Sequence, residues 1–372
     1  MDEREYAKGR GEGKVEPQGD LGKLEESDLS DLSLQPAGVP WPTKVWPRGD
    51  LAASGADVRR VAALIARAFD APDDDLGETH AVLAVQGGRL VLERYAADIP
   101  SDSTRPSWSV AKSLTHALVG LVVSETGLDV AAPADVPTWR GPGDARGQIT
   151  LDHLLRMSSG LAWVEDYEPG HPSDVLEMLF GAGKSDVARF AADKPLIHPP
   201  GKHFYYSSGT TNIIASALAR RIGLSGDAFA AWMGRRLFAP LGMVSPVPRL
   251  DAAGTFIGSS FCFCTAEDFA RFGLFYARDG VWEGRRLLPE GWVAHARRST
   301  PQQMGGEGDG PYGAHWWLDR AGPGSFSACG YEGQHIAICP DRDLVIVRLG
   351  VTPLATQPAA QAWVADLAEA FR

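Results

Sequence analysis

The chain has 372 residues, of which 44% are hydrophobic and 22% charged, and its formal net charge is −11. This length and apolar content are enough for a large core in two lobes or two domains. The negative charge argues against general nucleic-acid binding, which needs a cationic surface, and no apolar run reaches the ~18 residues of a membrane span.

The first 38 residues form a polar, acid-rich segment without the apolar stretch of a secretory signal. We expect residues 1–38 to be a mostly disordered tail, and the alternative is a segment that binds a partner. If Met1 is the true start, the absence of a signal predicts a cytoplasmic protein.

The region after this tail contains a helical pattern, a hairpin and a second helix. GADVRRVAALIARAF, residues 55–69, has apolar residues at helical spacing. HAVLAVQGGRLVLERY, residues 80–95, predicts two strands joined across Gly87 and Gly88. A helix over about 109–126 follows.

The last part of the chain adds further strands. A helix is predicted within 265–280, two strands within 325–351 around a PDRD turn, and a terminal helix over 357–371. Because hairpins join the strands, the sheet should be largely antiparallel.

Strand patterns near both ends, with helical patterns between them, predict the division of the chain. We expect residues 39–130 and 251–372 to share one α/β domain that contains the sheet. Residues 131–250 contain short helical patterns that end at glycines, and they should form a mainly helical domain.

The four cysteines do not have the spacing of a metal or redox site. In a strand, Cys262 and Cys264 would point to the same face. We interpret all four as small, buried, apolar residues in a reducing compartment.

The stretch SWSVAKSLTHALVGL, residues 107–121, carries the first candidate chemistry. Ser109 and Lys112 are three apart, so their side chains share a helix face. A serine at a helix start has unpaired backbone N–H groups that can stabilise an oxyanion, and a neutral lysine can serve as its base. The alternative is a solvated lysine, but the apolar residues around it leave little exposed surface.

Two further stretches become informative together. In HPPGKHFYYSSG, residues 198–209, Tyr206 could relay a proton if a cation lowered its pKa. The alternative is that Tyr205 and Tyr206 are packing aromatics and that Ser208 or Thr210 caps the following helix. Glycines in GYEGQ, residues 330–334, allow a substrate to approach a strand edge, and otherwise form a bulge or turn.

In this order the three stretches resemble the motifs of penicillin-recognising serine hydrolases. That family includes class C β-lactamases, DD-peptidases, family VIII carboxylesterases and 6-aminohexanoate-dimer hydrolases. The resemblance covers roughly residues 40–370 and includes LDHLLRMSSGLAW (151–163) and YGAHWWLD (312–319). It implies an α+β, β-lactamase/transpeptidase-like fold, an antiparallel sheet flanked by helices plus a helical lobe.

The resemblance also implies roles for individual residues. Ser109 would be the nucleophile and Lys112 its general base or the partner that sets its pKa. Tyr206 would help to pass the proton to the leaving group. The backbone N–H groups of Ser109 and Gln334 would form the oxyanion hole. The matching positions in the second and third motifs also imply that the substrate contacts Ser208, Tyr331 and Gly333.

Two features bear on the substrate. Tyr331 stands where β-lactamases carry a lysine, which argues against an efficient β-lactamase, since Glu332 beside it would repel a carboxylate. Tyr167 matches an extra tyrosine that assists amide cleavage in 6-aminohexanoate-dimer hydrolases, and the alternative is a packing aromatic in an acidic loop. Four tryptophans could form the wall of the pocket, and for each of them the alternative is packing in the core. They are Trp108, Trp163, Trp316 and Trp317.

We therefore expect a serine hydrolase that cleaves a small amide or ester without a metal or cofactor. It should have no nucleic-acid or membrane partner, and its oligomeric state is left open. The rivals are a D-amino-acid peptidase or weak β-lactamase, and a catalytically silent scaffold protein of the same fold.

Overall fold

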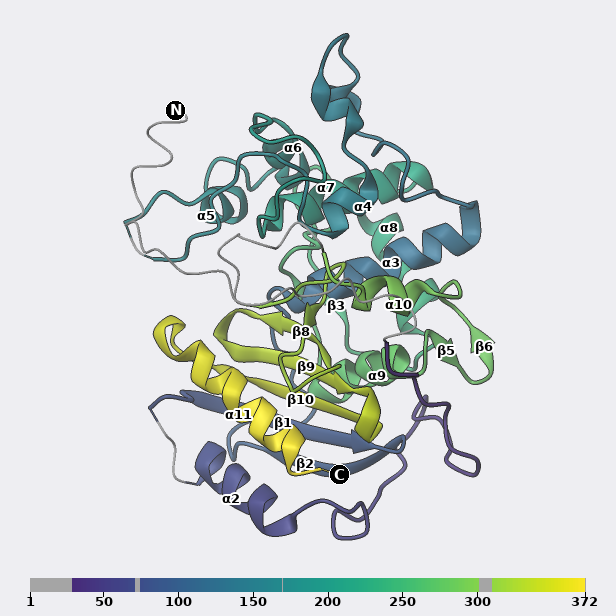
Figure 1. Ribbon diagram of the computed structural model, residues 1–372, viewed down its shortest axis with the longest axis vertical. Coiled ribbons are helices and arrows are strands. Elements are labelled where there is room, and N and C mark those ends of the chain that lie inside the picture. The colour runs from purple at the N-terminus through teal and green to yellow at the C-terminus, as the bar shows by residue number, and fades with distance from the viewer. Residues whose placement is uncertain (1–28, 71–73, 169, 301–309, 372) are drawn as a thin grey trace.

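The computed structural model describes residues 29–70, 74–168, 170–300 and 310–371. Its main feature is a six-stranded antiparallel sheet with strand order β2-β1-β10-β9-β8-β7 (Figure 1). The strands are β1 (Glu78–Gln86), β2 (Arg89–Tyr95), β7 (Trp317–Leu318), β8 (Phe326–Gly330), β9 (Gln334–Cys339) and β10 (Leu344–Val351). Two small hairpins pair β3 (Val247–Pro248) with β4 (Cys262–Phe263) and β5 (Val281–Trp282) with β6 (Arg285–Arg286).

The hairpin predicted over 80–95 is confirmed. Gly87 and Gly88 turn between β1 and β2 with φ of 56° and 72°, the left-handed values that a tight two-residue turn requires. On its other side, β1 pairs with β10, so that Leu83 lies opposite Val347. Strands from both ends of the chain therefore share one sheet, as expected.

The expectation of two strands within 325–351 is wrong, because three are present. The residues Tyr331–Gly333 form a single 3₁₀ turn that separates β8 from β9, and PDRD separates β9 from β10. Glycine-flanked YEG is too short to show a hairpin turn by its pattern alone.

Helices surround the sheet on both faces. Those of the described chain are α2 (Val58–Phe69), α3 (Val110–Thr126), α4 (Leu151–Leu155), α5 (Asp174–Leu179), α6 (Val187–Ala192), α7 (Ser208–Arg221), α8 (Gly226–Met233), α9 (Ala266–Ala277), α10 (Trp292–Arg297) and α11 (Gln357–Glu369). On one face, α2 and α11 pack against β1 and β10, with Trp363 and Ile346 fully buried. On the other face, α9 covers the alternate residues of the same strands, such as Leu83 and Val347, and α3 packs against β8 and β9.

The helices α4 to α8 gather beyond the sheet, at the top of Figure 1. The helix α3 lies between them and the sheet, since it contacts α7 on one side and β8 on the other. The start of α3 therefore stands where the helical part meets the sheet. The fold is α+β, as the resemblance implied, and the domain boundaries at 131 and 250 stay a prediction.

Part of the expected tail is ordered. Residues 1–28 lie outside the described residues, but residues 29–38 pack on the body, where Arg297 donates to the Ser30 carbonyl (2.8 Å) and Arg278 to Gln35 Oε1 (3.0 Å). Disorder as far as residue 38 is therefore wrong for this last part. No helix among the described residues is long and apolar enough to cross a membrane.

The cysteines are all unpaired. Cys262 and Cys264 lie on one face as predicted, fully buried with their sulfurs 3.9 Å apart. Cys339 is buried as well. Cys329 differs, because it is only half-buried and lines the cavity described next.

Candidate active site

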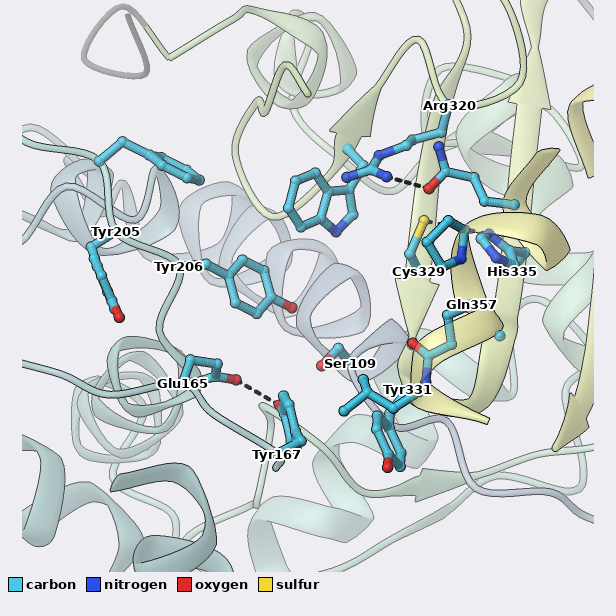
Figure 2. Close-up of a pocket in the computed structure, with 17 residues that line it drawn as sticks. Ser109, Glu165, Tyr167, Tyr205, Tyr206, Arg320, Cys329, Tyr331, His335 and Gln357 are labelled. Carbon is cyan, nitrogen blue, oxygen red and sulfur yellow. Dashed lines mark hydrogen bonds between the residues drawn. The ribbon is translucent and has the colours of Figure 1, made fainter. Parts of the chain in front are cut away.

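A cavity of about 680 Å³ lies where the start of α3, the turn between β8 and β9, and the start of α11 meet. Figure 2 shows Ser109 near its centre, with Tyr206 and Glu165 on one side and Tyr331 on another. The cavity therefore brings together all three of the sequence motifs.

Ser109 is placed at the mouth of α3 by an unusual turn. Trp108 before it has φ of 43°, a left-handed value that is rare for a bulky residue. Ser109 caps the helix by position, but its side chain makes no capping hydrogen bond, so its Oγ is available to Lys112. Within the described part of the chain its backbone N–H also has no acceptor, as an oxyanion donor requires.

Lys112 points back to Ser109 and is almost fully buried, with 1% of its surface exposed. Its Nζ lies 2.9 Å from Ser109 Oγ, 2.9 Å from Ser208 Oγ and 3.0 Å from the Ser259 carbonyl oxygen. Burial lowers the pKa of Lys112 from 10.5 to about 8, and the negative charge of Glu165 acts in the opposite direction. A drop of this size makes the neutral amine about 3 kcal/mol easier to form.

Glu165 connects to this lysine through Ser208. Ser208 donates its hydroxyl to Glu165 Oε1 (2.5 Å) and its backbone N–H to Oε2 (2.8 Å). Tyr167 Oη donates to Oε1 (2.8 Å) and Trp163 Nε1 to Oε2 (2.6 Å). A chain of hydrogen bonds thus runs from Glu165 through Ser208 and Lys112 to Ser109.

Tyr206 faces Ser109 from the loop before α7. Its ring stacks on Trp317, and Lys112 Nζ lies 4.8 Å from the ring centroid. Burial raises the pKa of Tyr206 above its ordinary value, Glu165 raises it further, and a hydrogen bond with Ser109 has the opposite effect. The Arg320 cation also acts to lower this pKa, but its effect is smaller than that of burial, so the phenol keeps its proton. The cap of α7 is Ser207, not Ser208 or Thr210.

The third motif touches the first. A Cβ added at Gly330 would lie 2.6 Å from the Ser107 carbonyl oxygen and 3.2 Å from Ser109 N, so only a glycine fits there. Glu332 accepts a hydrogen bond from Trp108 Nε1 (2.8 Å). The end of β8 therefore holds the turn that presents Ser109 to the cavity.

The turn between β8 and β9 is also held by hydrogen bonds to β10. Gln334, which pairs with Gly330 across the turn, donates its side chain to the Gly350 carbonyl oxygen (2.6 Å). Gly333 lines the cavity, and its carbonyl accepts from Arg348 Nη1 (2.7 Å).

Other predicted substrate contacts divide into two groups. Tyr167 and Tyr331 line the cavity and stack with ring centroids 5.1 Å apart, and Trp317 lines it as well. Trp163 and Ser208, only 2% and 0% exposed, do not line it and instead hold Glu165. The two remaining tryptophans do not line it either: Trp316 is fully buried in the core, and Trp108 bonds to Glu332.

Several residues that line the cavity were not singled out from the sequence, among them the acid Glu165 and the cation Arg320. In the sequence Glu165 is one of three neighbouring acids, with Asp166 and Glu168, and nothing in the pattern distinguishes it from the other two. Arg320 lines the cavity from just beyond β7, after the quoted YGAHWWLD stretch. The aromatic run before it was the only available signal.

The family model described as Beta-lactamase matches residues 65–370. The chain belongs to the β-lactamase family. It is 27% identical over 329 residues to the 6-aminohexanoate-dimer hydrolase of Paenarthrobacter ureafaciens, an alignment that covers 84% of this chain and 83% of that protein. As a member of this family, the protein is a serine hydrolase.

Solved structures agree on the fold. A Bacillus anthracis protein assigned as a 6-aminohexanoate-dimer hydrolase superposes with a TM-score of 0.70 at 20% identity, over 92% of this chain and 90% of that one. A penicillin-binding protein from Bacillus halodurans superposes with a TM-score of 0.60 at 17% identity, over 81% of this chain and 98% of that one. At such low identities these β-lactamase-family likenesses support the fold alone.

Proposed function

We propose that this hydrolase cleaves a small amide or short-chain ester through an acyl-enzyme on Ser109. One observation carries the proposal: the buried Lys112 amine lies 2.9 Å from Ser109 Oγ, in surroundings that lower its pKa to about 8. At neutral pH a useful fraction of such a lysine is uncharged and can accept a proton.

The first half of the reaction forms the acyl-enzyme. Neutral Lys112 donates its two protons to Ser208 Oγ and the Ser259 carbonyl oxygen and accepts the Ser109 proton on its lone pair. Ser109 Oγ then attacks the carbonyl carbon of the substrate. The N–H groups of Ser109 and Gln334 are the proposed donors to the resulting oxyanion.

Collapse of this tetrahedral intermediate to the acyl-enzyme breaks the bond to the leaving group, which needs a proton. Tyr206, which keeps its phenolic proton, passes that proton to the departing nitrogen or oxygen and regains one from protonated Lys112. Water then attacks the acyl carbon with the same groups acting in reverse, which frees the acid and restores Ser109. Bond formation and bond cleavage thus use one set of proton carriers.

Substrate class follows from the cavity and from the relatives. The cavity is large enough for a chain of several carbons and has aromatic walls, among them Tyr167, Tyr206 and Trp317. The curated relative is named for the dimer of 6-aminohexanoate, a small linear amide. Tyr331 offers no cation at the third motif, which speaks against efficient β-lactam hydrolysis.

A fluorophosphonate probe tests the nucleophile. Wild type should be labelled on Ser109, and Ser109→Ala should lose both labelling and turnover of p-nitrophenyl esters, because among the described residues Ser109 is the only serine that both lies within hydrogen-bond distance of Lys112 Nζ and lines the cavity. Ser124→Ala is the matched control, since this serine is exposed on the same helix. Equal labelling of wild type and Ser109→Ala would overturn the proposal and favour the silent scaffold.

Tyr167→Phe tests the preference for amides. The Tyr167 hydroxyl bonds to Glu165 at the wall of the cavity, where it can also hydrogen-bond a leaving group. The nitrogen that leaves an amide must be protonated, whereas p-nitrophenolate can leave without a proton. We expect a loss of about tenfold or more on ω-amino-acid amides and little loss on p-nitrophenyl esters. An equal loss on both would argue against this role.

The remaining rivals are separated by substrate. A panel that includes nitrocefin and D-peptides ranks the weak β-lactamase and the D-amino-acid peptidase against the amidase. A D-peptidase that acts on the cell wall would have to be exported, whereas the cytoplasmic location stays a prediction that cell fractionation can test.

A further inference from the structure

One end of the cavity carries a cation that the mechanism does not use. Arg320, Gln357 and Gln361 line this end, from beyond β7 and from α11. Figure 2 shows Arg320 and Gln357 on one side of Ser109, and Glu165 with Tyr167 on the other. A substrate that reaches Ser109 can therefore extend toward either group.

Arg320 is held in place without an opposite charge. Its Nη1 donates to the neutral Gln361 side chain, and its guanidinium carbon lies 4.3 Å from the Trp317 ring centroid. Across the described residues no carboxylate stands within ion-pair distance of it. It is also the only lysine or arginine among the described residues that line the cavity.

Two donors at this end have no partner. Arg320 Nε and Gln357 Nε2 are both shielded from solvent and make no hydrogen bond to any described residue. Buried polar atoms are nearly always paired. Arg105 Nε and Arg348 Nε are unpaired as well, but among the described residues only Arg320 and Gln357 carry such a donor on a side chain that lines this cavity, where an acceptor can enter.

The neighbouring groups do not neutralise this charge. Burial lowers the pKa of His335 to about 3, and Arg348 and Arg320 lower it as well, so this imidazole is neutral. Glu165, the acid that lines the cavity, already accepts hydrogen bonds from Trp163, Ser208 and Tyr167. A positive potential is thus left at the α11 end.

We propose that Arg320, with Gln357, forms a carboxylate subsite, so that the substrate is an amide or ester with a free carboxylate on the side of its scissile bond that extends toward α11. A guanidinium binds a carboxylate through paired N–H groups, and Arg320 carries such a group at the wall of the cavity. The choice of substrate class rests on the proposed function, but the anion site itself does not.

A binding experiment tests the subsite without catalysis. In the Ser109→Ala background, calorimetry compares 6-acetamidohexanoate with its neutral analogue 6-acetamidohexanamide. The carboxylate should bind at least tenfold more tightly, and added salt should reduce the difference. Arg320→Gln should abolish the preference, and Arg235→Gln, which removes an exposed arginine elsewhere, should keep it.

Two further variants separate recognition from packing, because Arg320 also supports Trp317. Arg320→Lys keeps the charge but not the paired donors and should retain part of the preference. Gln357→Leu acts from α11 and should weaken carboxylate binding without touching Trp317. Equal binding of acid and amide, or a preference that survives Arg320→Gln, would overturn the subsite.

Kinetics then locate the carboxylate. The ratio of kcat/KM for p-nitrophenyl hydrogen glutarate over p-nitrophenyl butyrate reports an acyl-side carboxylate. The ratio for 4-butanoyloxybenzoate over its methyl ester reports one on the leaving group. One ratio should fall about tenfold in Arg320→Gln, and constancy of both would contradict the proposal. If no ester is cleaved and Ser109 resists labelling, the proposed function fails while calorimetry still decides the subsite.

Discussion

Burial and Glu165 act on the Lys112 amine in opposite directions. Burial favours the neutral form that can accept the Ser109 proton, whereas the Glu165 charge, relayed by Ser208, favours the ammonium. The pKa of Lys112 therefore stays at about 8, so that near neutral pH the charged and the neutral amine are both present.

Replacement of Glu165 should move the pH profile. In Glu165→Gln the charge that raises the pKa of Lys112 is gone, so this pKa falls below about 8 and the neutral amine persists at lower pH. The acid limb of kcat/KM for a neutral ester should shift to lower pH by about one unit.

Asp166→Asn is the matched control for this shift. Asp166 is the next residue, but it accepts from the Glu168 backbone and from His171, away from Lys112. Its profile should coincide with that of wild type. An acid limb that stays in place or moves to higher pH in Glu165→Gln would contradict the assignment.

For single residues, the sequence predicts a pair of neighbouring side chains on one helix better than a hydrogen-bond network that joins separate elements. The spacing of Ser109 and Lys112 placed them on one helix face, and their apolar neighbours indicated burial. The link from Lys112 to Glu165 depends on how a separate loop folds across α7, and no local pattern records that. For the same reason the sequence left open whether a cation lowers the pKa of Tyr206, and in the structure burial outweighs the effect of Arg320.

Among the secondary-structure elements, β8 affects the site most directly, because its last residue abuts the turn before α3. Gly330→Ala should push a methyl group against the Ser107 carbonyl and Ser109 N. A displacement of the nucleophile by a fraction of an ångström to one ångström should reduce kcat/KM by about 100-fold, with a small loss of thermal stability.

Gly234→Ala is the control for this substitution. Gly234 follows α8 with φ of −55°, and no atom lies within 4 Å of an added Cβ there. It should retain full activity. Wild-type rates in Gly330→Ala, measured with a p-nitrophenyl ester, would show that β8 does not position Ser109.

Elements with a long periodic pattern could be predicted, and short ones could not. The hairpin around Gly87 and the helix that starts at Val110 were found because alternation or helical spacing continues over many residues. The β8–β9 turn was interpreted as a motif that precedes a single strand, because a turn of three residues is too short to show a helical or strand periodicity. What holds that turn, the Glu332 contact to Trp108, joins distant parts of the chain.

For the whole molecule, buried neutral histidines predict a loss of stability in acid. Burial lowers the pKa of both His315 and His335 from 6.5 to about 3. As the pH falls below 6.5, the unfolded chain takes up protons at these sites and the folded chain does not, so unfolding becomes more favourable. Each histidine should contribute about 1.4 kcal/mol per pH unit until the pH nears 3.

Urea unfolding at pH 6.5 and 4.5 measures this effect. The free energy of unfolding should fall by about 5 kcal/mol from the two histidines together. In His335→Gln the fall should be smaller by about 2 kcal/mol, the share of one such histidine, whereas His171→Gln, at an exposed position, should behave as wild type. An unchanged fall in His335→Gln would contradict the prediction.

The pairing of β1 with β10 has a consequence for how the protein is made. On the ribosome the β1–β2 hairpin emerges early, but the strand that covers its open edge belongs to the last part of the chain. Closing so long a loop is slow, and until then an apolar strand edge is open to other chains. Gly330 and α11 also arrive late, so a nascent chain that already contains Ser109 and Lys112 is not yet an enzyme.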